Sequence, residues 1–268
     1  MLFSIDLDGT LLAPDSTISD QNLESMFRAH RQQHQISIIS ARPVSSIISL
    51  LTSYNLITVV QYIAGYNGSQ IYDLKKQKVI YENIFSSAEA EGVIRLLNNI
   101  GVDYHAFGTQ DMYQIRDDIS DYTHYESKLF SLPIIMLPSS VPSIVKFSLV
   151  GPAKTIDRYK NQIIKQVGDR YSCFRTSENY FEICKKGNTK GTALKHIRCL
   201  YKEIVTISIG DQENDIPMFS EADYSFAVSN ASTLVKLQAG RVVDNNKFIG
   251  VSRAILECID VLVPKSGN

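Results

Sequence analysis

The sequence predicts an α/β protein whose Rossmann-like parallel-sheet core is interrupted by an inserted α+β module. Strand and helix patterns alternate over residues 1–83 and again over residues 188–268. Over residues 84–187 the strands and helices are grouped differently, which indicates a module of its own. A chain of 268 residues is also long for one ordinary domain. We therefore expect a core of residues 1–83 and 188–268 and an insert of residues 84–187.

The first segment alternates strands and helices up to a hairpin. Ser19 or Asp20 can cap a helix that runs to about Gln33, and Pro43 suits the first turn of a helix to Tyr54. The other elements expected here are the strands Leu2–Ile5, Ile36–Ile39 and Tyr62–Ala64, the turn pair Asn67-Gly68, and a hairpin of residues 70–74 and 79–82.

The insert is expected to begin with a helix and to continue mainly as strands. Ser86 and Glu89 form a capping box for a helix to Ile100. Strand-like runs follow near Tyr104 and Tyr113 and over residues 144–150, 171–175 and 180–183, with a helix pattern over residues 155–167. Between Asp117 and Pro142 the pattern indicates a helix followed by a loop broken by prolines.

The alternation returns at Lys190. The elements expected from there are a helix to about Tyr201, a strand over residues 204–209 ending at Gly210-Asp211, a short helix after Asp215, a strand over residues 225–228, a helix from Ser232, the strand Val242-Val243 and a final helix from Ile249. Because this pattern repeats that of the first segment, we expect both ends of the chain to share one sheet.

Composition and charge exclude several classes of function. A net charge of -1 gives no electrostatic basis for binding nucleic acid or an anionic membrane. No apolar run is long enough to span a bilayer, and the acidic N-terminus does not match a signal peptide. The cysteines, none of them in a C-x-x-C pair, indicate reduced thiols. We therefore expect a cytoplasmic protein, a monomer or weak homodimer, whose partner is a small molecule.

Acidic and hydroxyl side chains stand where the expected core strands end. Asp6 and Asp8 follow the first strand, and residues two apart on a strand point to the same side. Ser40 and Asp211 end two other strands, although Ser40 alone would also suit a helix cap and Asp211 a loop. In open parallel sheets, ligands bind outside the carboxyl ends of the strands, so we expect these residues to form one site.

Acids crowded at a strand end repel each other and need a cation. Asp6, Asp8 and Asp211 would make a hard oxygen site suited to Mg²⁺, which favours sites completed by a phosphate. Asp215 begins a helix, where negative charge is favoured, and this role explains Asp215 without a metal. Lys190 also stands at a helix start, where a positive charge is unfavourable. A role in binding phosphate is therefore an attractive alternative to that of an ordinary surface lysine.

Together these segments resemble the haloacid dehalogenase superfamily, specifically Cof-type phosphatases with a large inserted cap of the C2 type (subfamily IIB). Residues 6–10 resemble its first motif, and Ser40-Ala41-Arg42 resembles the second, with Ala41 in place of the usual Gly. Thr189-Lys190-Gly191 resembles the third motif and residues 210–218 the fourth. The pairs Asn67-Gly68 and Gly250-Val251 and the segment Ser229-Asn230-Ala231, with Ser229 in place of a Gly, also match in position.

The resemblance implies a role for each site residue. Asp6 would be the nucleophile that forms an aspartyl-phosphate, and Asp8 the general acid and then the base. The implied Mg²⁺ ligands are Asp6, Asp8 through its carbonyl, Asp211, and Asp215 either directly or from beside Asp211. The implied phosphate-binding groups are the amides of Leu7 and Ala41 and the side chains of Ser40, Lys190 and Asn214.

The implied activity is Mg²⁺-dependent hydrolysis of small phosphorylated metabolites, sugar phosphates first among them. Two alternatives remain open. A phosphomutase of the same cap class would keep the phosphate on the sugar, and a non-catalytic protein on this scaffold would bind a ligand without turnover. The presence of Asp6, Asp8, Lys190 and Asp211 together argues against a non-catalytic protein.

Overall fold

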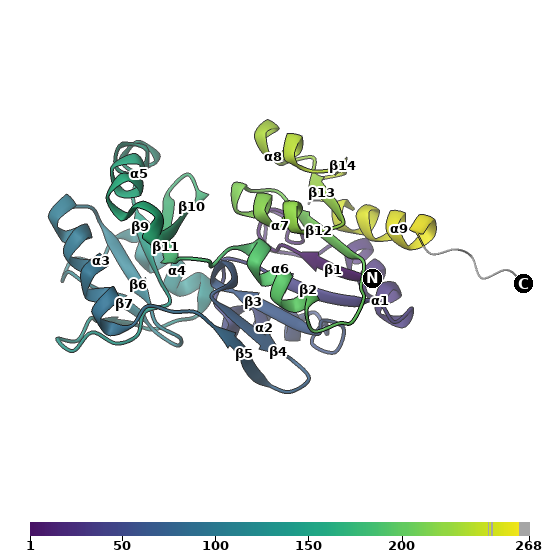
Figure 1. Cartoon of the computed structure of the whole chain (residues 1–268), viewed down its shortest axis with the longest axis horizontal. Helices are drawn as coiled ribbons and strands as arrows, with labels where there is room; N and C mark the ends of the chain where they lie inside the picture. Colours follow the sequence, from purple (N-terminus) through teal and green to yellow (C-terminus); the bar gives the residue numbers. More distant parts are fainter. Residues whose placement is uncertain (246, 248, 263–268) are drawn as a thin grey trace, which may run out of the picture.

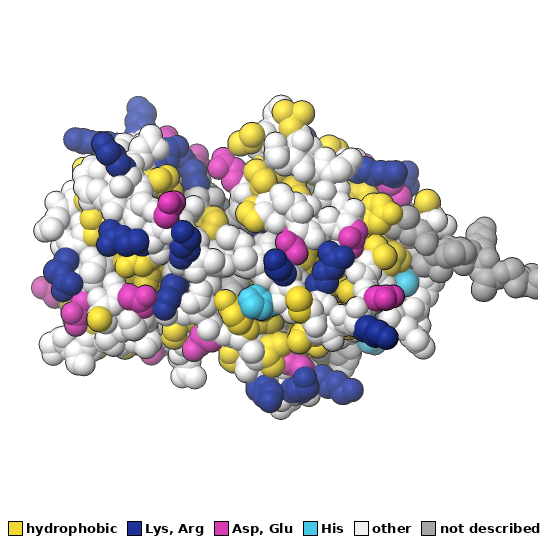
Figure 2. Space-filling model, in the orientation of Figure 1, with side chains coloured by type: hydrophobic (Ala, Val, Ile, Leu, Met, Phe, Trp, Pro, Cys, Tyr) yellow, Lys and Arg dark blue, Asp and Glu magenta, His cyan; other side chains and the backbone are white. Residues whose placement is uncertain are grey.

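The computed structural model describes residues 1–245, 247 and 249–262. They form two lobes with one β-sheet each (Figure 1). One lobe, the core, is made by both ends of the described chain, and the other, the cap, by the segment between them. On the face shown in Figure 2, Lys and Arg side chains are interspersed with Asp and Glu. Among the described residues, no helix has the length and apolar character needed to cross a membrane.

The core lobe contains an eight-stranded sheet in the order β14-β13-β12-β1-β2-β3-β4-β5. Its strands are β1 (Leu2–Ile5), β2 (Gln35–Ile39), β3 (Tyr62–Gly65), β4 (Gln70–Asp73), β5 (Lys78–Glu82), β12 (Thr206–Gly210), β13 (Tyr224–Val228) and β14 (Arg241–Val243). Pairing is parallel from β14 to β3, and β4 and β5 continue the sheet as an antiparallel hairpin. Because β1 lies between β12 and β2, the carboxyl ends of these strands meet at the centre of one sheet edge.

Helices cover both faces of the core sheet. On one face, α1 (Asp20–Arg31), α2 (Val44–Ser53) and α9 (Gly250–Leu262) pack against Phe3 and Ile5 of β1. On the other, α6 (Lys190–Arg198) and α7 (Ile216–Glu221) pack against Leu2 and Ile39. The remaining helical elements of the core are α8 (Thr233–Gln238) and the 3₁₀ turns Tyr66–Gly68 and Glu213–Asp215. The sheet is therefore apolar on both sides, as parallel sheets require.

The cap contains a six-stranded sheet in the order β10-β11-β9-β6-β7-β8. Its elements are α3 (Ser87–Ile100), β6 (Tyr104–Phe107), β7 (Met112–Gln114), α4 (Asp121–Phe130), β8 (Ile134–Met136), β9 (Lys146–Val150), α5 (Ala153–Val167), the 3₁₀ turn Gly168–Arg170, β10 (Tyr171–Ser177) and β11 (Tyr180–Lys185). Phe147 and Leu149 of β9 pack with α3 and α5. The alternate residues Lys146 and Ser148 point to the opposite face, where Ser148 Oγ donates to Glu126 of α4 at 3.4 Å.

The two lobes meet where the chain crosses between them, after β5 and after β11. Asn83 Nδ2 donates to Asn188 Oδ1 at 2.8 Å, and Asn188 Nδ2 donates to the Asn83 carbonyl at 2.7 Å, so the crossing segments are hydrogen-bonded to each other. Tyr66, in the turn after β3, is fully buried among cap side chains that include Phe107 and Val145. This turn of the core is thus anchored in the cap.

The structure confirms the α/β core with an inserted α+β cap and differs from the sequence predictions mainly in residues 117–142. The predicted helix is α4, but β8 forms where the sequence predicts a loop. Among the described strands β8 pairs with β7 alone, as an edge strand, so the flanking Pro133 and Pro138 cost no ladder hydrogen bond in the sheet centre. In addition, α6 ends at Arg198 rather than near Tyr201, and β12 begins at Thr206 rather than at residue 204.

Candidate active site

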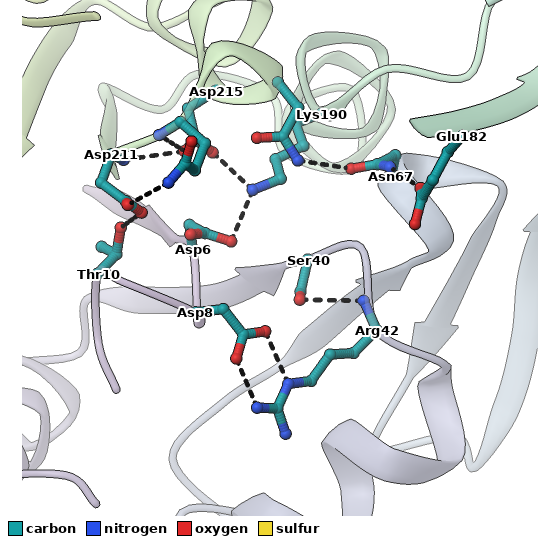
Figure 3. A network of polar contacts seen from close by, with 12 residues as sticks. Asp6, Asp8, Thr10, Ser40, Arg42, Asn67, Glu182, Lys190, Asp211 and Asp215 are labelled. Carbon is teal, nitrogen blue, oxygen red and sulfur yellow. Dashed lines mark hydrogen bonds and ion pairs between the residues drawn. The ribbon is translucent and has the colours of Figure 1, made fainter. Parts of the chain in front are cut away.

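The structure brings Asp6, Ser40 and Asp211 together at the carboxyl edge of the core sheet (Figure 3). Each is the first residue after its strand, β1, β2 or β12, and each is at most 3% exposed. The Asp6 amide donates to the Ile209 carbonyl at 3.0 Å, which extends the β1–β12 ladder by one bond and sets Asp6 beside Asp211. The prediction that these strand ends converge is therefore confirmed by the geometry.

Lys190 is a buried bridge between two carboxylates. It is the first residue of α6 and is 2% exposed. Its Nζ donates to Asp6 Oδ1 at 2.6 Å and to Asp215 Oδ1 at 2.7 Å. Burial lowers the pKa of Lys190, but Asp215 and Asp6 outweigh burial and raise this pKa above its ordinary value. Lys190 therefore carries a positive charge next to the expected nucleophile.

The acids of the site repel each other in spite of this lysine. Burial raises the pKa of Asp6 well above its ordinary value; Lys190 opposes the effect, and Asp215 and Asp211 add to it. Burial and the charge of Asp215 raise the pKa of Asp211 to about 6. Thr10 Oγ1 donates to Asp211 Oδ1 at 2.7 Å and so fixes that carboxylate. Asp6, Asp211 and Asp215, if all were ionised, would carry more negative charge than Lys190 balances.

Two glycines let these loops approach closely. Gly9 has φ +84°, and a Cβ there would lie 2.3 Å from Asp211 Oδ2. A Cβ on Gly210 would lie 2.4 Å from Asp215 Cγ. Any larger residue at either position would push an acid out of the cluster.

The fully buried Asp215 organises the loop after β12. Its Oδ2 accepts hydrogen bonds from the amides of Asp211 and Gln212, both at 2.9 Å, while its Oδ1 accepts from Lys190. Asp215 thus fixes both Asp211 and Lys190, which goes beyond the favourable charge at a helix start that the sequence indicated.

The carboxylates of Asp6, Asp211 and Asp215 fit a metal ion. One oxygen from each lies within 4.8 Å of the others. An all-oxygen donor set suits the hard cation Mg²⁺. Burial raises the pKa values of Asp6 and Asp211 and the neighbouring acids add to the rise, so a cation would stabilise their ionised forms. The Asp8 side chain is not in this group, so its backbone carbonyl is the atom that Asp8 could contribute.

Asp8 lies apart from the acid cluster and is held by Arg42. Arg42 Nε donates to Asp8 Oδ2 at 2.7 Å and Nη2 donates to Oδ1 at 2.5 Å, a bidentate pair. The Asp8 side chain is 55% exposed, whereas that of Arg42 is 6% exposed. Burial lowers the pKa of Arg42, but the bonds and charge of Asp8 outweigh it and raise this pKa. Arg42 therefore orients a solvent-accessible carboxylate at the mouth of the site.

Backbone and hydroxyl donors surround Asp6. Among the described residues, the amides of Leu7 and Ala41 have no hydrogen-bond acceptor, so both can donate to a ligand. Ser40 Oγ accepts from the Arg42 amide at 3.2 Å, which leaves the hydroxyl hydrogen free to donate. These groups and Lys190 can neutralise and orient an anionic ligand next to Asp6.

Asn214 belongs to a chain of hydrogen bonds that leads into the cap. Its Nδ2 donates to Asn67 Oδ1 at 2.9 Å, and Asn67 Nδ2 donates to Glu182 Oε2 at 2.7 Å. Figure 3 shows Asn67 beside Glu182. Asn214 Oδ1 is buried and has no partner within the described chain, so it can accept from a bound water or ligand.

A cavity of about 680 Å³ connects these groups with the cap. The core contributes the floor, which includes Asp6, Asp8, Ser40 and Lys190. The cap contributes the walls: residues of α4, residues 176–180 of the β10–β11 hairpin, Lys146 and Glu182. The volume suits a small-molecule ligand.

Comparisons with known proteins identify the family of this chain. The family model for haloacid dehalogenase-like hydrolases matches residues 3–255. A Streptococcus pyogenes protein is 28% identical over 262 residues, covering 95% of this chain and 96% of the relative. The 5-amino-6-(5-phospho-D-ribitylamino)uracil phosphatase of Bacillus subtilis is 26% identical over 272 residues, or 96% of each chain. A solved sugar phosphatase of subclass IIB superposes with TM-score 0.81 at 19% identity, covering 97% of this chain and 98% of the other.

The chain therefore belongs to the family of haloacid dehalogenase-like hydrolases. Within that family it is a Cof-type phosphatase with an inserted cap.

Sequence reasoning assigned no role to several residues of the site. Arg42 stands in a motif that was recognised, yet its pairing with Asp8 depends on the fold. Lys146 and Glu182 interrupt apolar strands, a pattern that could have marked them, because an isolated charge in a buried strand needs a partner. Thr10, adjacent to Gly9, gave no signal of its contact with Asp211.

Proposed function

We propose that this protein is a Mg²⁺-dependent phosphatase that hydrolyses small phosphorylated metabolites through an aspartyl-phosphate on Asp6. The observation that supports this most is the separation of two carboxylates. Asp6 is buried beside Lys190, and Asp8 is exposed at the cavity and held by Arg42. Such a pair suits one nucleophile and one proton donor for the same phosphoryl group.

In the first step, Asp6 attacks the phosphorus atom and the bond from phosphorus to the leaving oxygen breaks. Asp8, in its protonated form, gives its proton to that oxygen, so the product alcohol leaves uncharged. Lys190, Ser40 and the free amides hold the phosphoryl oxygens while charge moves between them.

In the second step, a water molecule attacks the phosphorus of the aspartyl-phosphate. Asp8, now a carboxylate, takes a proton from this water, and the Asp6 carboxylate leaves with the electrons of the broken P–O bond. Orthophosphate and the starting enzyme result.

Mg²⁺ would neutralise the negative charge that Asp6 and the phosphate share. It would be held by Asp6, Asp211 and the Asp8 carbonyl, with Asp215 beside them. Asp215 fixes Asp211 and Lys190 whether or not it also binds the metal directly.

We propose sugar phosphates as the first class of substrate. The cavity of about 680 Å³ has room for a monosaccharide phosphate, and its cap walls carry hydroxyl and carboxylate groups that can bind sugar hydroxyls. Relatives act on varied phosphate esters: one of them, from Escherichia coli, is a pyridoxal phosphate phosphatase. The cap walls would select among leaving groups.

We also propose that residues 84–187 move as one cap on hinges near Asn83 and Gly187. Gly187 has φ +87°, a conformation that favours glycine, and a Cβ there would meet no atom within 4 Å. Closure would exclude bulk water from the aspartyl-phosphate.

Release of orthophosphate from a panel of esters tests this function. The panel contains sugar phosphates, nucleotides, flavin mononucleotide and pyridoxal phosphate, each with and without Mg²⁺. We expect release from sugar phosphates that depends on Mg²⁺. Conversion of one sugar phosphate to its isomer without free orthophosphate would instead indicate a phosphomutase, and ligand binding with no reaction would indicate a non-catalytic protein.

A further inference from the structure

Two charged residues of the cap contact the phosphate side of the site without touching the acid cluster. Lys146 of β9 and Glu182 of β11 are 0% and 1% exposed and form an ion pair. Lys146 Nζ also donates to the Ala41 carbonyl at 3.2 Å, and Glu182 accepts from Asn67. A buried ion pair is costly to desolvate and adds little stability by itself, so its contacts with the core point to another role.

The hydrogen bonds that run from Glu182 to Asn214 have a fixed direction. A carboxylate can only accept, so Asn67 must turn its Nδ2 toward Glu182 and its Oδ1 toward Asn214. Asn214 must then donate its Nδ2 to Asn67. The charge on Glu182 therefore keeps Asn214 Nδ2 at the end of the amide that faces Asn67. One Nδ2 hydrogen binds Asn67 and the second remains to donate to a ligand, whereas Oδ1 can only accept.

We propose that Glu182 and Lys146 are positioning residues of the phosphate site. Glu182 orients the Asn214 amide through Asn67, and Lys146 holds the Ser40-to-Arg42 loop by the Ala41 carbonyl. The inference rests on the proposed function, in which Asn214 and Ala41 bind phosphoryl oxygens. Because both charges belong to the cap, the phosphate site is complete only when the cap is docked as it is here.

Glu182→Gln tests the direction of these hydrogen bonds. Lys146 requires an acceptor, so the new Nε2 faces Asn67, and the amides of Asn67 and Asn214 must both reverse. We expect the affinity for orthophosphate, measured by calorimetry with Mg²⁺ present, to fall about tenfold, the effect of one lost hydrogen bond to a charged group. KM for phosphate esters should rise by a similar factor, with a smaller change in kcat.

A second substitution should restore the original direction. In the double variant Glu182→Gln, Asn67→Asp, the carboxylate at position 67 accepts from both the new amide and Asn214 Nδ2. We expect orthophosphate affinity to return to within about threefold of the native protein. Asn67→Asp alone places two carboxylates side by side and should bind orthophosphate weakly. If the ion pair only stabilised the fold, Asn67→Asp would not restore the orthophosphate affinity of Glu182→Gln, because Lys146 would still lack its charged partner.

Asp73→Asn is the matched control. Asp73 is 3% exposed and pairs with Lys76 outside the cavity, so its variant should bind orthophosphate as the native protein does. Native affinity in a folded Glu182→Gln variant, or a double variant no better than the single ones, would overturn the inference. If Glu182→Gln alone does not fold, the orthophosphate affinities of Asn67→Asp and of the double variant are compared instead, and the double variant should bind more tightly. A native protein that binds orthophosphate but hydrolyses no ester would refute the proposed function alone.

Discussion

At the scale of single residues, the site separates acids by their surroundings. Asp6 and Asp211 are buried with raised pKa values, whereas Asp8 is exposed and paired with Arg42. The same residue type can therefore serve as nucleophile, metal ligand and proton donor within one cavity.

Replacing Arg42 should affect proton transfer in particular. Arg42→Lys removes the bidentate hold on Asp8, so kcat for an alkyl phosphate should fall by at least about tenfold, since a positioned general acid contributes roughly 10²–10⁴-fold. Hydrolysis of para-nitrophenyl phosphate, whose leaving group needs little protonation, should fall less. Steady-state kinetics with both substrates measures the difference, with Arg116→Lys on the exposed cap surface as control. An equal loss for both substrates would count against this role.

Magnesium binding should depend on the protonation of Asp211. Its folded-state pKa of about 6 is above the ordinary value, so without metal the folded state binds this proton more tightly than the unfolded state. The stability of the metal-free protein should then fall as pH rises through about 6, while Mg²⁺ must displace the proton. We expect the rise in Tm on adding Mg²⁺ to be larger at about pH 7.5 than at about pH 5.5. Asp211→Asn should remove this shift, and equal shifts at both pH values would contradict the assignment.

At the scale of elements, the strand ends were predictable and the contacts between lobes were not. Apolar runs that end in Asp6, Ser40 and Asp211 identify the site edge, because parallel strands align their carboxyl ends. The partners of Asp8 and Asn67 could not be predicted. Arg42 reaches Asp8 only through the geometry of the loop, and Glu182 reaches Asn67 only because the cap is docked on the core.

The loop after β1 should tolerate no side chain at Gly9. Gly9→Ala meets a positive φ and the Asp211 carboxylate, so we expect a loss of about 1–3 kcal/mol in the free energy of unfolding and a large loss of activity. Gly92→Ala is the control: Gly92 lies in α3 with open space around it, and Ala there should stabilise by about 0.5–1 kcal/mol. Urea unfolding measures both. A stable and fully active Gly9→Ala variant would disprove the close packing inferred here.

At the scale of the whole molecule, one sheet carries the chemistry and the other covers it. The alternation of strands and helices on either side of the insert predicted a parallel-sheet core interrupted by an α+β cap. The cap's internal arrangement was less predictable, because β8 is an edge strand of Ile134–Met136 between prolines and its pairing with β7 leaves no clear periodic signal. The cap strands β9 and β11 alternate apolar residues with polar ones such as Lys146 and Glu182. The apolar face of the cap sheet therefore packs on α3 and α5, and the polar face is turned toward the site.

The most direct test is to trap the phosphoryl group on Asp6. Native protein mixed with Mg²⁺ and a hydrolysed ester, quenched in acid during turnover and analysed by mass spectrometry, should carry one added phosphoryl group that maps to Asp6. Asp6→Asn should stay folded, since it keeps the shape of the side chain, but should neither carry this group nor release orthophosphate. A folded Asp6→Asn variant that still releases orthophosphate at the native rate would contradict the mechanism.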